Sequence, residues 1–502
     1  MSPRVEDFLS DQVARRPAAF AMSDGTGAQW RWQDLSVASD AAAACLAERG
    51  VVAGDRVVIL CENSAAAVAF LFGCWRTGAV AVPVNARQSA AELARIFDHA
   101  APRAVVFTTA VSPDATAHAA RHDTVSLTGA FGTVQIATPH ASNPEEDPCL
   151  AVLLYTTGTT GMPKGVMLSH ANLRFGGMAS ARLRGMTARD LIYGVLPISH
   201  VFGLASIVTA AAYTGAAIRF EARFSASKLH AALGQGITLL SAVPQMHALL
   251  MQYTAAQGHE RLGSDNLRYV SSGAAPLDPT WKRKAEAFYG VALQNGYGMT
   301  ETTAGVTITD NPLGSEDISA GPPLPGVELR IDQSVPGGGD GLGEVLTRGG
   351  HVMLGYFRNL EETARVLDAQ GWMHTGDLGK IDEAGNLHIL GRSKELIIHG
   401  GFNVYPPEVE AAINDHPQVI QSAVIGKMTA GDEEVLAFVQ VAPACDLSPD
   451  SLRDFLKDRL AGYKRPSAIV LATELPAAPT GKILKHRLLT HFADQLRERA
   501  GS

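Results

Sequence analysis

The chain has 502 residues, 46% of them hydrophobic, which is enough to bury large cores and favours two or three globular domains. Acidic residues outnumber basic ones by 50 to 42, so the broad basic field that non-specific nucleic-acid binding needs is missing and we expect no nucleic-acid partner. The five cysteines are scattered and never spaced CxxC, which fits neither a disulfide framework nor a zinc site and favours a reducing, cytoplasmic setting.

Two stretches bear on membrane association. Residues 1–17 alternate acids, arginines and apolar residues at helical spacing, and they lack the apolar core of a signal peptide. Residues 201–218, "VFGLASIVTAAAYTGAAI", approach the length of a membrane span but are rich in Ala, Gly and Thr. We expect a buried helix there and no integral membrane association.

The first two thirds of the chain alternate apolar strands with helical patterns. Residues 55–85 predict a βαβ unit, with a helix that begins at Asn63 or Ser64 and stops at Gly78. Further buried strands are expected in "RAVVFTT", "CLAVLLYT", "LIYGVLPI", "TLLSAVP" and "LRYVSSG", and a helix in "PTWKRKAEAFYG". This alternation predicts an α/β fold with doubly wound sheets.

The pattern changes toward the C-terminus. The turn-rich segment "SVPGGGDGLGEVLTRGG" predicts short antiparallel strands and a β subdomain over about 322–392. From about Glu395 the pattern is α+β: a helix in "PPEVEAAINDH", strands in "VIQSAVIG" and "EVLAFVQVA", and a capped helix in "SPDSLRDFLKDRLAG". We expect a large N-terminal domain over 1–392 and a small C-terminal domain over 393–502.

A glycine- and threonine-rich stretch, "YTTGTTGMPKG", follows the apolar run "AVLL". Backbone N–H groups at the end of a strand can converge on an anion, glycines let phosphate oxygens approach, and Lys164 adds charge. The stretch is not the GxxxxGK[ST] loop of the common NTPases, because Pro163 stands where that pattern needs glycine. Spacing leaves both a phosphate loop and a plain polar turn open.

Three downstream motifs are each ambiguous on their own. "NGYGMTE" at 295–301 fits a nucleotide site or a tight turn with a capped helix. An aspartate after a glycine, such as Asp377 in "WMHTGDLG", is usually a turn residue. A lysine near the C-terminus, such as Lys482 in "PTGKILKHRL", is usually a solvated surface charge. The segment "GRSKELIIHGGFNVYPPEVE" lies between the last two.

Taken in order, these motifs resemble those of the adenylate-forming superfamily, which includes acyl-CoA synthetases, peptide-synthetase adenylation domains and beetle luciferases. The resemblance runs from about residue 55 to Lys482, and Thr157 stands where serine is usual. It implies an AMP-forming acid–thiol ligase. Such an enzyme uses ATP and Mg²⁺ to activate a carboxylic acid, and it transfers the acyl group to CoA.

The resemblance also implies roles at the ATP site. The glycine-threonine loop holds the β- and γ-phosphates, Tyr297 lies against adenine, and Thr300 contacts the α-phosphate. Glu301 coordinates Mg²⁺, and Asp377 holds the ribose hydroxyls together with Arg392. The other expected ATP-binding residues are Thr156, Thr157, Gly158, Thr159, Thr160, Gly161, Lys164, Gly273, Ala274, Ala275, Pro276, Asn295, Gly296 and Gly298.

In the family pattern the small domain is mobile. Lys394 occupies the hinge position, Gly400 and Gly401 border the tunnel for the CoA thiol, and Lys482 inserts between the acyl carboxylate and the α-phosphate. Because two anions must react, a cation placed in advance stabilises the charge that builds at phosphorus. We expect Lys482 to serve the first half-reaction and a domain swing to remove it for the second.

The segment "PISHVFGL" supplies the first residues that we expect to contact the acid substrate. His200 is either a satisfied core histidine or, by the resemblance, a residue that positions the substrate, and it is counted with Thr300, Glu301 and Lys482 as catalytic. Amino-acid-activating relatives usually place an acid just after this point, whereas Val201 and Phe202 follow here, which favours an acid with an apolar body. The other expected wall residues are small: Ser206, Ser272, Ala304 and Gly305.

Small walls leave room for an aromatic ring or a medium alkyl chain, so the expected substrate is an aromatic or medium-chain monocarboxylic acid. A dicarboxylate would need a cation deep in the pocket; Arg268 is the candidate in the sequence, but arginine is common at its position among relatives. Two rival functions stand beside the ligase: a stand-alone adenylating enzyme that loads a separate carrier protein, and a nucleotide-binding regulator without catalysis. The joint presence of the chemistry-bearing residues disfavours the regulator.

Overall fold

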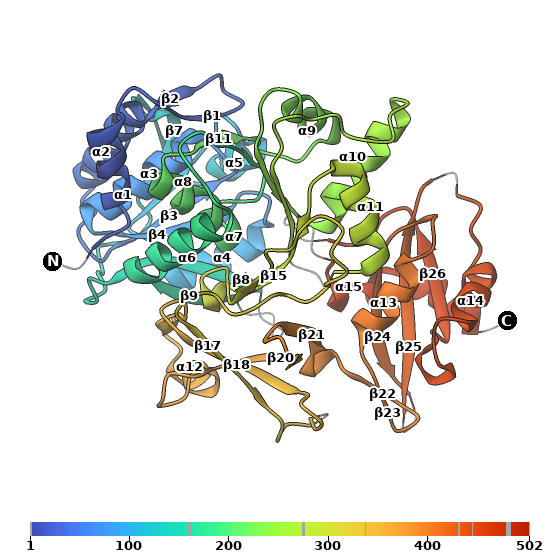
Figure 1. The fold of residues 1–502 in the computed structure, drawn as a ribbon. Helices are drawn as coiled ribbons and strands as arrows, with labels where there is room; N and C mark the ends of the chain where they lie inside the picture. The colour runs from blue at the N-terminus through green and yellow to red at the C-terminus, as the bar shows by residue number, and fades with distance from the viewer. Residues whose placement is uncertain are drawn as a thin grey trace.

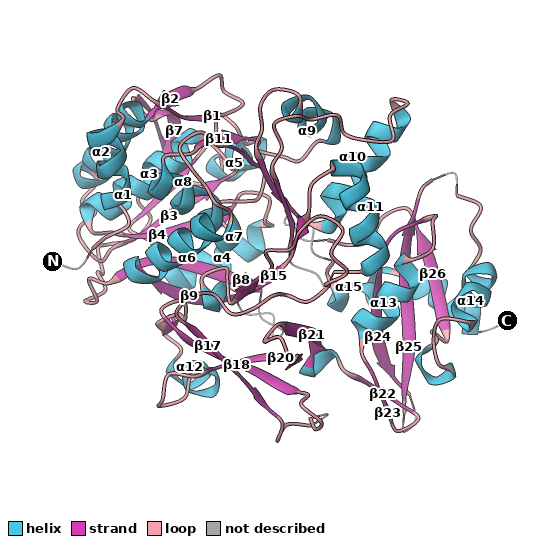
Figure 2. Ribbon diagram, viewed as in Figure 1, coloured by secondary structure: helices cyan, strands magenta, loops and turns pink. Residues whose placement is uncertain are grey.

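The computed structural model describes residues 3–157, 163–273, 277–336, 338–429, 432–443, 445–477 and 483–500. Figure 1 shows a large part, coloured blue to yellow, and a smaller C-terminal part beside it, coloured orange to red. Figure 2 shows helices packed around the strands of the large part. The mixed α/β architecture agrees with the fold class expected from the sequence.

An eight-stranded sheet lies at the centre of the large part, in the order β19-β9-β8-β4-β3-β5-β7-β6. Neighbours among β8, β4, β3 and β5 pair in parallel, and the outer strands are antiparallel. The strands are β3 (Arg56–Cys61), β4 (Val80–Asn85), β5 (Ala104–Phe107), β6 (Val125–Gly129), β7 (Gly132–Ala137), β8 (Leu150–Thr157), β9 (Pro163–Ser169) and β19 (Gly355–Tyr356). Every residue of β3 and β4 is buried, as continuous apolar runs predict for strands covered on both faces.

The predicted βαβ unit is confirmed. Helix α3 (Ala65–Thr77) connects β3 to β4; the Ser64 side chain caps it by accepting a hydrogen bond from the Ala67 amide, and Gly78 ends it with a φ of 73°. This left-handed conformation favours glycine, which has no Cβ to clash. Helix α2 (Trp32–Glu48) packs so closely on α3 that a Cβ at Gly73 would lie 2.8 Å from that of Ala42.

A seven-stranded sheet forms a second layer, in the order β14-β13-β12-β10-β11-β1-β2. All neighbours pair in parallel except β1 and β2. The strands are β1 (Phe20–Ser23), β2 (Gln29–Arg31), β10 (Leu191–Gly194), β11 (Ala217–Phe220), β12 (Leu239–Ala242), β13 (Tyr269–Ser272) and β14 (Leu293–Gln294). The strands predicted from apolar runs correspond to β5, β8, β10, β12 and β13.

The remaining helices of the large part cover these sheets (Figure 1). They are α1 (Asp7–Arg15), α4 (Ala90–Ala100), α5 (Pro113–Ala119), α6 (His170–Leu183), α9 (Ala226–Leu233), α10 (Pro244–Ala256), α11 (Pro279–Tyr289) and α12 (Leu360–Val366). One continuous hydrophobic core runs through both sheets and the helices between them. Val201 belongs to this core, and Phe202 and Ala304 pack against it.

The apolar stretch 201–218 forms the expected buried wall. It comprises α7 (Val201–Gly203), a π-helix (Leu204–Thr209) and α8 (Ala210–Thr214) before β11 begins. No pattern in the sequence indicated the π-helical turn, a feature that is rare and occurs often at functional sites. Within the described ranges, the model contains no helix with the length and apolar character of a membrane span.

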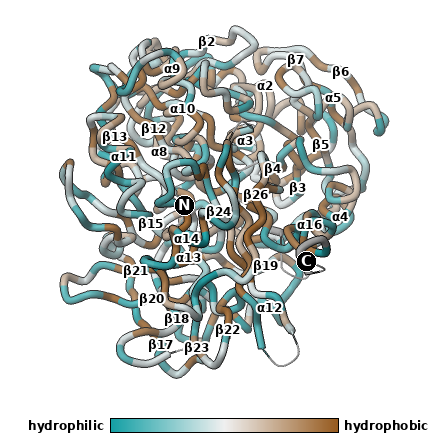
Figure 3. Tube along the Cα trace, turned by 90° about the vertical axis from the view of Figure 1, so that its right-hand side faces the viewer, coloured by the Kyte–Doolittle hydropathy of each residue, from teal (hydrophilic) through white to brown (hydrophobic). Residues whose placement is uncertain are grey.

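An antiparallel sheet in the order β17-β18-β20-β21 falls within the expected β subdomain. Its strands are β17 (Val327–Asp332), β18 (Gly343–Gly349), β20 (Met373–Ile381) and β21 (Leu387–Arg392), and a two-stranded ribbon of β15 (Gly296–Tyr297) and β16 (Thr307–Ile308) precedes it. In Figure 3 this region is largely hydrophilic in colour, unlike the brown strands of the C-terminal sheet. A sheet with partly exposed faces suits a platform for a soluble ligand.

The C-terminal part has its own hydrophobic cores. A three-stranded sheet of β24 (Val419–Met428), β25 (Glu433–Val441) and β26 (Ala468–Ala472) is preceded by a hairpin of β22 (Ile397–His399) and β23 (Phe402–Val404). Its helices are α13 (Pro406–Asn414), α14 (Pro449–Lys457), α15 (Lys485–His491) and α16 (Ala493–Ala500). The two helices and two strands expected here are α13, α14, β24 and β25.

Candidate active site

The glycine-threonine loop joins two antiparallel strands, not a strand and a helix. Thr156 pairs with Lys164, and Thr157 pairs with Pro163, at the end of the β8–β9 ladder. The loop therefore differs in geometry from the strand-to-helix loop of common NTPases, as Pro163 indicated. The predicted loop residues Gly158, Thr159, Thr160 and Gly161 lie outside the described residues, as do Ala274, Ala275, Pro276 and Lys482, and for Thr157 only the backbone is described.

Lys164 and Glu301 meet at one aromatic side chain, Tyr356. The ammonium of Lys164 lies 5.0 Å from the centroid of the Tyr356 ring and forms an ion pair with Glu362. The Tyr356 hydroxyl donates a 2.8 Å hydrogen bond to Oε1 of Glu301. Burial, and then the negative charge of Glu301, raise the pKa of Tyr356, so its hydroxyl remains a donor. Tyr356 thus connects the phosphate-loop lysine to the predicted Mg²⁺ ligand.

The Asn295–Glu301 segment is held in an unusual backbone conformation. Thr300 and Glu301 are each 7% exposed and begin a short 3₁₀ turn, after which Thr303 and Ala304 have φ angles of 50° and 78°. Left-handed non-glycine residues are strained, and strain of this kind clusters at functional sites. Gly298 packs against this turn so tightly that a Cβ would lie 2.0 Å from the Ala304 carbonyl oxygen.

Three predicted residues converge on one carboxylate. Asp377 on β20 and Arg392 on β21 are directly paired across the sheet, with Nε of Arg392 3.1 Å from Oδ1 of Asp377. The Tyr297 hydroxyl donates a 2.6 Å hydrogen bond to Oδ2 of the same carboxylate. Burial, followed by the Asp377 charge, keeps the pKa of Tyr297 well above its usual value. The structure therefore brings together the expected adenine and ribose residues.

Asn295 carries an unused acceptor beside this cluster. Its side-chain amide donates a 3.1 Å hydrogen bond to the Ser319 carbonyl, and its backbone amide donates to Oγ1 of Thr309. Its side-chain oxygen is buried and has no partner among the described residues. A buried acceptor without a donor is unfavourable, so the position suits a ligand amino group.

The predicted acyl-side residues gather around α7 and the π-helix. His200 is exposed and caps α7, its Nδ1 accepting a 3.2 Å hydrogen bond from the Phe202 amide. Val201 is 2% exposed, and the half-buried ring of Phe202 approaches Gly273 so closely that a Cβ there would lie 2.9 Å from Cε1. His200 is therefore not a core histidine, because its side chain is exposed.

Small residues let the other walls come close. A Cβ at Gly176 of α6 would lie 2.8 Å from the Thr303 carbonyl and 3.3 Å from Cβ of Ala205, so this glycine joins the π-helix to the turn before Gly305. Ser206, within the π-helix, and Ser272, at the end of β13, are both buried. The predicted wall residues thus lie on elements that pack directly against one another.

Two arginines near this region differ sharply in their contacts. Arg268 binds Asp190 through Nε at 2.8 Å and Nη2 at 2.7 Å, and it donates to the carbonyls of Arg184 and Gly185. Its guanidinium is therefore occupied in an ion pair with Asp190, which disfavours a role as a substrate ligand. Arg184, by contrast, is 5% exposed and donates through Nη1 to the Ser206 carbonyl at 2.9 Å.

The predicted hinge and thiol-tunnel residues lie on the small part and next to it. Lys394 is exposed in the 3₁₀ turn Ser393–Glu395, directly after β21. Gly400 and Gly401 form the tip of the β22–β23 hairpin with φ angles of 59° and 78°, and the Gly400 amide donates a 2.9 Å hydrogen bond to Asp432. A Cβ on either glycine would meet nothing within 4 Å, so the tip is open for a ligand to approach.

The small part presents one particular side to the large part. Helix α15, which begins three residues after Lys482, lies next to the large part, and Arg487 on it is 3.9 Å from Glu92 of α4. The β22–β23 hairpin lies at the opposite, lower end (Figure 1). The helix that follows Lys482 in the sequence therefore lies next to the large part, whereas the β22–β23 hairpin lies at the other end of the small part.

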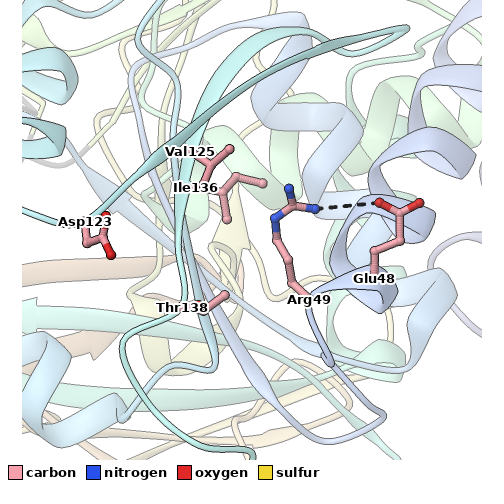
Figure 4. A pocket seen from close by; sticks show the side chains of 6 residues that line it. All are labelled: Glu48, Arg49, Asp123, Val125, Ile136 and Thr138. Atoms are coloured by element: carbon pink, nitrogen blue, oxygen red, sulfur yellow. Dashed lines mark ion pairs between the residues drawn. The ribbon is translucent and has the colours of Figure 1, made fainter.

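A cavity of about 360 Å³ elsewhere in the fold is not part of this site. It lies between the end of α2 and the β6–β7 hairpin, where Arg49 forms a 3.9 Å ion pair with Glu48 (Figure 4). It contains none of the predicted site residues. No cluster of three or more metal-binding side chains occurs in the described ranges.

Comparisons with known proteins agree with this geometry. The chain matches the model of the AMP-binding enzyme family over residues 9–357 and that of its C-terminal domain over residues 408–482. It is 31% identical to a sulfoacetate–CoA ligase of Cupriavidus necator, covering 97% of this chain and 99% of that one, and 32% identical to a feruloyl-CoA synthase of an Amycolatopsis species, covering 95% and 96%. The chain therefore belongs to the AMP-binding enzyme family, the adenylate-forming superfamily of the acyl-CoA synthetases.

A solved relative bears on the arrangement of the two parts. Crystal structures of MatB from Rhodopseudomonas palustris, 31% identical and covering 98% of this chain and 99% of that one, align with TM-scores of 0.83 for the ATP-bound form and 0.72 for the apo form. Since the same relative gives both values, the difference reflects conformation. Overall, this structure is more similar to the ATP-bound form than to the apo form.

Sequence reasoning missed Tyr356 and Arg184. Tyr356 belongs to a two-residue strand with no motif of its own, and Arg184 ends a helix, where a basic residue usually interacts with the helix dipole. Only the tertiary contacts distinguish them.

Proposed function

We propose that this protein is an AMP-forming acid–CoA ligase that converts a carboxylic acid, ATP and CoA into acyl-CoA, AMP and pyrophosphate. The substrate we propose is an acid with an aromatic or medium-length alkyl body. The observation that carries this proposal is that the Asn295–Glu301 segment joins two clusters, Tyr297–Asp377–Arg392 at one end and Glu301–Tyr356–Lys164 at the other. One segment thus supplies contacts suited to a nucleoside and contacts suited to its phosphates.

The residues present fit MgATP. The unpartnered oxygen of Asn295 suits the adenine amino group, and Asp377 suits the two ribose hydroxyls, since a carboxylate can accept two hydrogen bonds. Lys164 would exchange Glu362 for phosphate oxygens, and Glu301 would hold Mg²⁺. Bound Mg²⁺ would neutralise phosphate charge, which favours attack by an anion at phosphorus.

The first half-reaction follows from these positions. The acid carboxylate attacks the α-phosphorus, the P–O bond to the β-phosphate breaks, and pyrophosphate leaves with the electron pair. Thr300 would orient the α-phosphate, His200 would position the acid, and Lys482 would stabilise the negative charge that grows on the phosphoryl oxygens. The inward face of α15 supports a role for Lys482 in this arrangement.

The second half-reaction requires the small domain to turn. Rotation at Lys394 would withdraw Lys482 and bring the hairpin tip with Gly400 and Gly401 to the acyl-adenylate. The CoA thiol then attacks the acyl carbon, and AMP leaves. We propose domain boundaries at 392/393, since β21 ends at Arg392 and the next strand belongs to the small part.

Pyrophosphate exchange tests the first half-reaction directly. Radiolabelled pyrophosphate is incorporated into ATP only if the acyl-adenylate forms reversibly, and a panel of benzoates, cinnamates and short to long alkanoates would identify the acid. Release of AMP with CoA, compared with a phosphopantetheinyl carrier protein, separates the ligase from an enzyme that loads a carrier. Absence of exchange with every acid would favour a nucleotide-binding regulator.

We place the activity in the cytoplasm. All five cysteines are free thiols, with Cys45, Cys61 and Cys74 buried, and this agrees with a reducing compartment that supplies ATP and CoA.

A further inference from the structure

A buried arginine borders the acyl side of the site. The guanidinium carbon of Arg184 lies 5.9 Å from the ring centroid of Phe202 and 5.6 Å from that of Tyr269, and Nη1 donates to the Ser206 carbonyl. Phe202 contacts Gly273, and Ser206 lies in the π-helix, both at the proposed acyl pocket. The guanidinium therefore lies behind Phe202 on the π-helix side of the pocket.

Besides its two aromatic neighbours, the guanidinium of Arg184 has no acidic partner within the described part of the chain. Among the described residues its hydrogen-bond acceptor is a neutral backbone carbonyl, and its Nε is buried with no partner. The hydroxyl of the neighbouring Tyr269 is also buried and unpartnered within those residues. Burial of a charge without a counter-ion is strongly unfavourable, and native proteins normally pair or hydrogen-bond such groups.

The acid close to this region, Asp190, pairs with a different arginine, Arg268. Arg268 lies next to Tyr269 in sequence and takes both oxygens of Asp190, together with the Arg184 carbonyl. Hydrogen bonds from this arginine help to lower the pKa of Asp190 even though burial opposes its ionisation. The counter-ion is thus committed to Arg268, and Arg184 keeps an unused donor.

We propose that Arg184 and Tyr269 form a subsite for a second oxyanion, carried by the acid at the end distant from its reacting carboxylate. This inference rests on the proposed function and narrows its substrate to an acid that ends in a second carboxylate or a similar oxyanion. A carboxylate there would accept hydrogen bonds from Nε of Arg184 and from the Tyr269 hydroxyl, and would neutralise the guanidinium.

Phe202 would control access to the subsite. Its half-buried ring lies against Gly273 and next to the guanidinium, so a change of its side-chain rotamer would let the distal group reach Arg184. Its apolar ring would still line the body of the acid. The subsite is therefore compatible with an acid whose middle is aromatic or aliphatic.

Matched acids test the subsite. Pyrophosphate exchange would be measured for adipate against its monomethyl ester and for terephthalate against 4-methylbenzoate, pairs that differ chiefly at the distal end. We expect kcat/KM for the diacid to exceed that of its neutral partner by about tenfold or more, since a charge-assisted bidentate contact is lost in the neutral acid. A preference of the wild-type enzyme for the neutral acids would overturn the proposal.

Substitution of Arg184 links any preference to this residue. In Arg184→Met the diacid-to-neutral ratio should fall by about tenfold, Arg184→Lys should retain part of it, and Tyr269→Phe should cause a smaller loss. Because the ratio is taken within one preparation, partial loss of folded enzyme cancels. Arg268→Met is the matched control and should leave the ratio unchanged. An unchanged ratio in Arg184→Met would refute the subsite.

The outcomes separate the two proposals. Exchange with neutral acids but without a diacid advantage would remove the subsite and keep the ligase. Exchange with no acid at all would remove the ligase and, with it, the subsite.

Discussion

The hydroxyl of Tyr297 donates a 2.6 Å hydrogen bond to Oδ2 of Asp377, although 80 positions separate the two residues. Arg392 contacts the other oxygen of the same carboxylate. Both oxygens are thus oriented by protein donors, so the orientation of the carboxylate is set before any ligand binds. Preorganisation of this kind lowers the entropy that a ligand must give up on binding.

This relationship makes a prediction about nucleotide recognition. Asp377→Ala should weaken ATP binding and abolish discrimination between ATP and 2′-deoxyATP, because the acceptor of the 2′-hydroxyl is gone. Tyr297→Phe should weaken ATP binding by about tenfold, the effect of one lost hydrogen bond to a charged group. Isothermal titration with both nucleotides measures this. Equal discrimination in wild type and Asp377→Ala would contradict the ribose role.

Tyr356 offers a test of the link between Lys164 and Glu301. Tyr356→Phe keeps the ring beside Lys164 but removes the hydroxyl that orients Glu301, so the Mg²⁺ concentration for half-maximal pyrophosphate exchange should rise severalfold. Tyr193→Phe is the matched control, since the buried Tyr193 hydroxyl has no partner among the described residues. If both variants need the same Mg²⁺ concentration, Tyr356 does not orient the metal ligand.

Lys482 should matter for only one half-reaction. Lys482→Ala is expected to reduce adenylate formation by at least about 100-fold, the usual scale for removing a group that stabilises transition-state charge. Thioester formation from preformed acyl-adenylate should stay within a fewfold of wild type. Stopped assays of each half measure the two rates, and an equal fall in both would contradict the division of labour.

The hinge makes the opposite prediction. Lys394→Pro fixes φ at the residue where the turn Ser393–Glu395 would rotate, so it should slow thioester formation more than adenylation. The greater overall similarity of this structure to the ATP-bound form of MatB agrees with that direction. Equal slowing of both halves would argue against a domain swing.

Acid should destabilise the folded protein through its buried histidines. Burial lowers the pKa of His247 from 6.5 to about 4, and that of His351 also to about 4. Because the folded-state pKa lies below the unfolded one, the stabilisation is present above pH 6.5 and is lost as the pH falls toward 4. For one such histidine the loss between pH 7 and pH 5 is about 2 kcal/mol.

Urea unfolding at pH 7 and pH 5 measures this loss. His247→Asn should unfold at lower urea at pH 7, because the hydrogen bonds to Tyr289 and Ser271 change, but its midpoint should depend less on pH than that of wild type. An unchanged pH dependence in this variant would show that His247 does not titrate on unfolding.

Helix ends and buried strands could be predicted because each depends on residues that are close together in the sequence. The stop at Gly78 and the cap at Ser64 are single-residue features, and the strands of the parallel sheets are apolar on both faces. The π-helix could not be predicted, since its register depends on Gly176 and Gly177 of α6 packing against it.

The site divides in the same way. Residues within one motif, such as Thr300 and Glu301, could be proposed from the sequence because the motif resembles that of a family. Tyr356 and Arg184 were not, because what distinguishes them is a contact with a distant element and, for Arg184, a missing partner. Neither a long-range contact nor an unpaired donor leaves a periodic pattern in the chain.

Lys485 forms ion pairs with Glu395 at 3.0 Å and with Glu410 at 2.9 Å, across 90 residues of sequence in the first case. Glu395 directly follows Lys394, and Lys485 lies three residues after Lys482. We therefore predict that these two ion pairs couple a rotation at Lys394 to the segment that follows Lys482. Rotation at Lys394 and withdrawal of Lys482 from the active site should then occur together, in one movement.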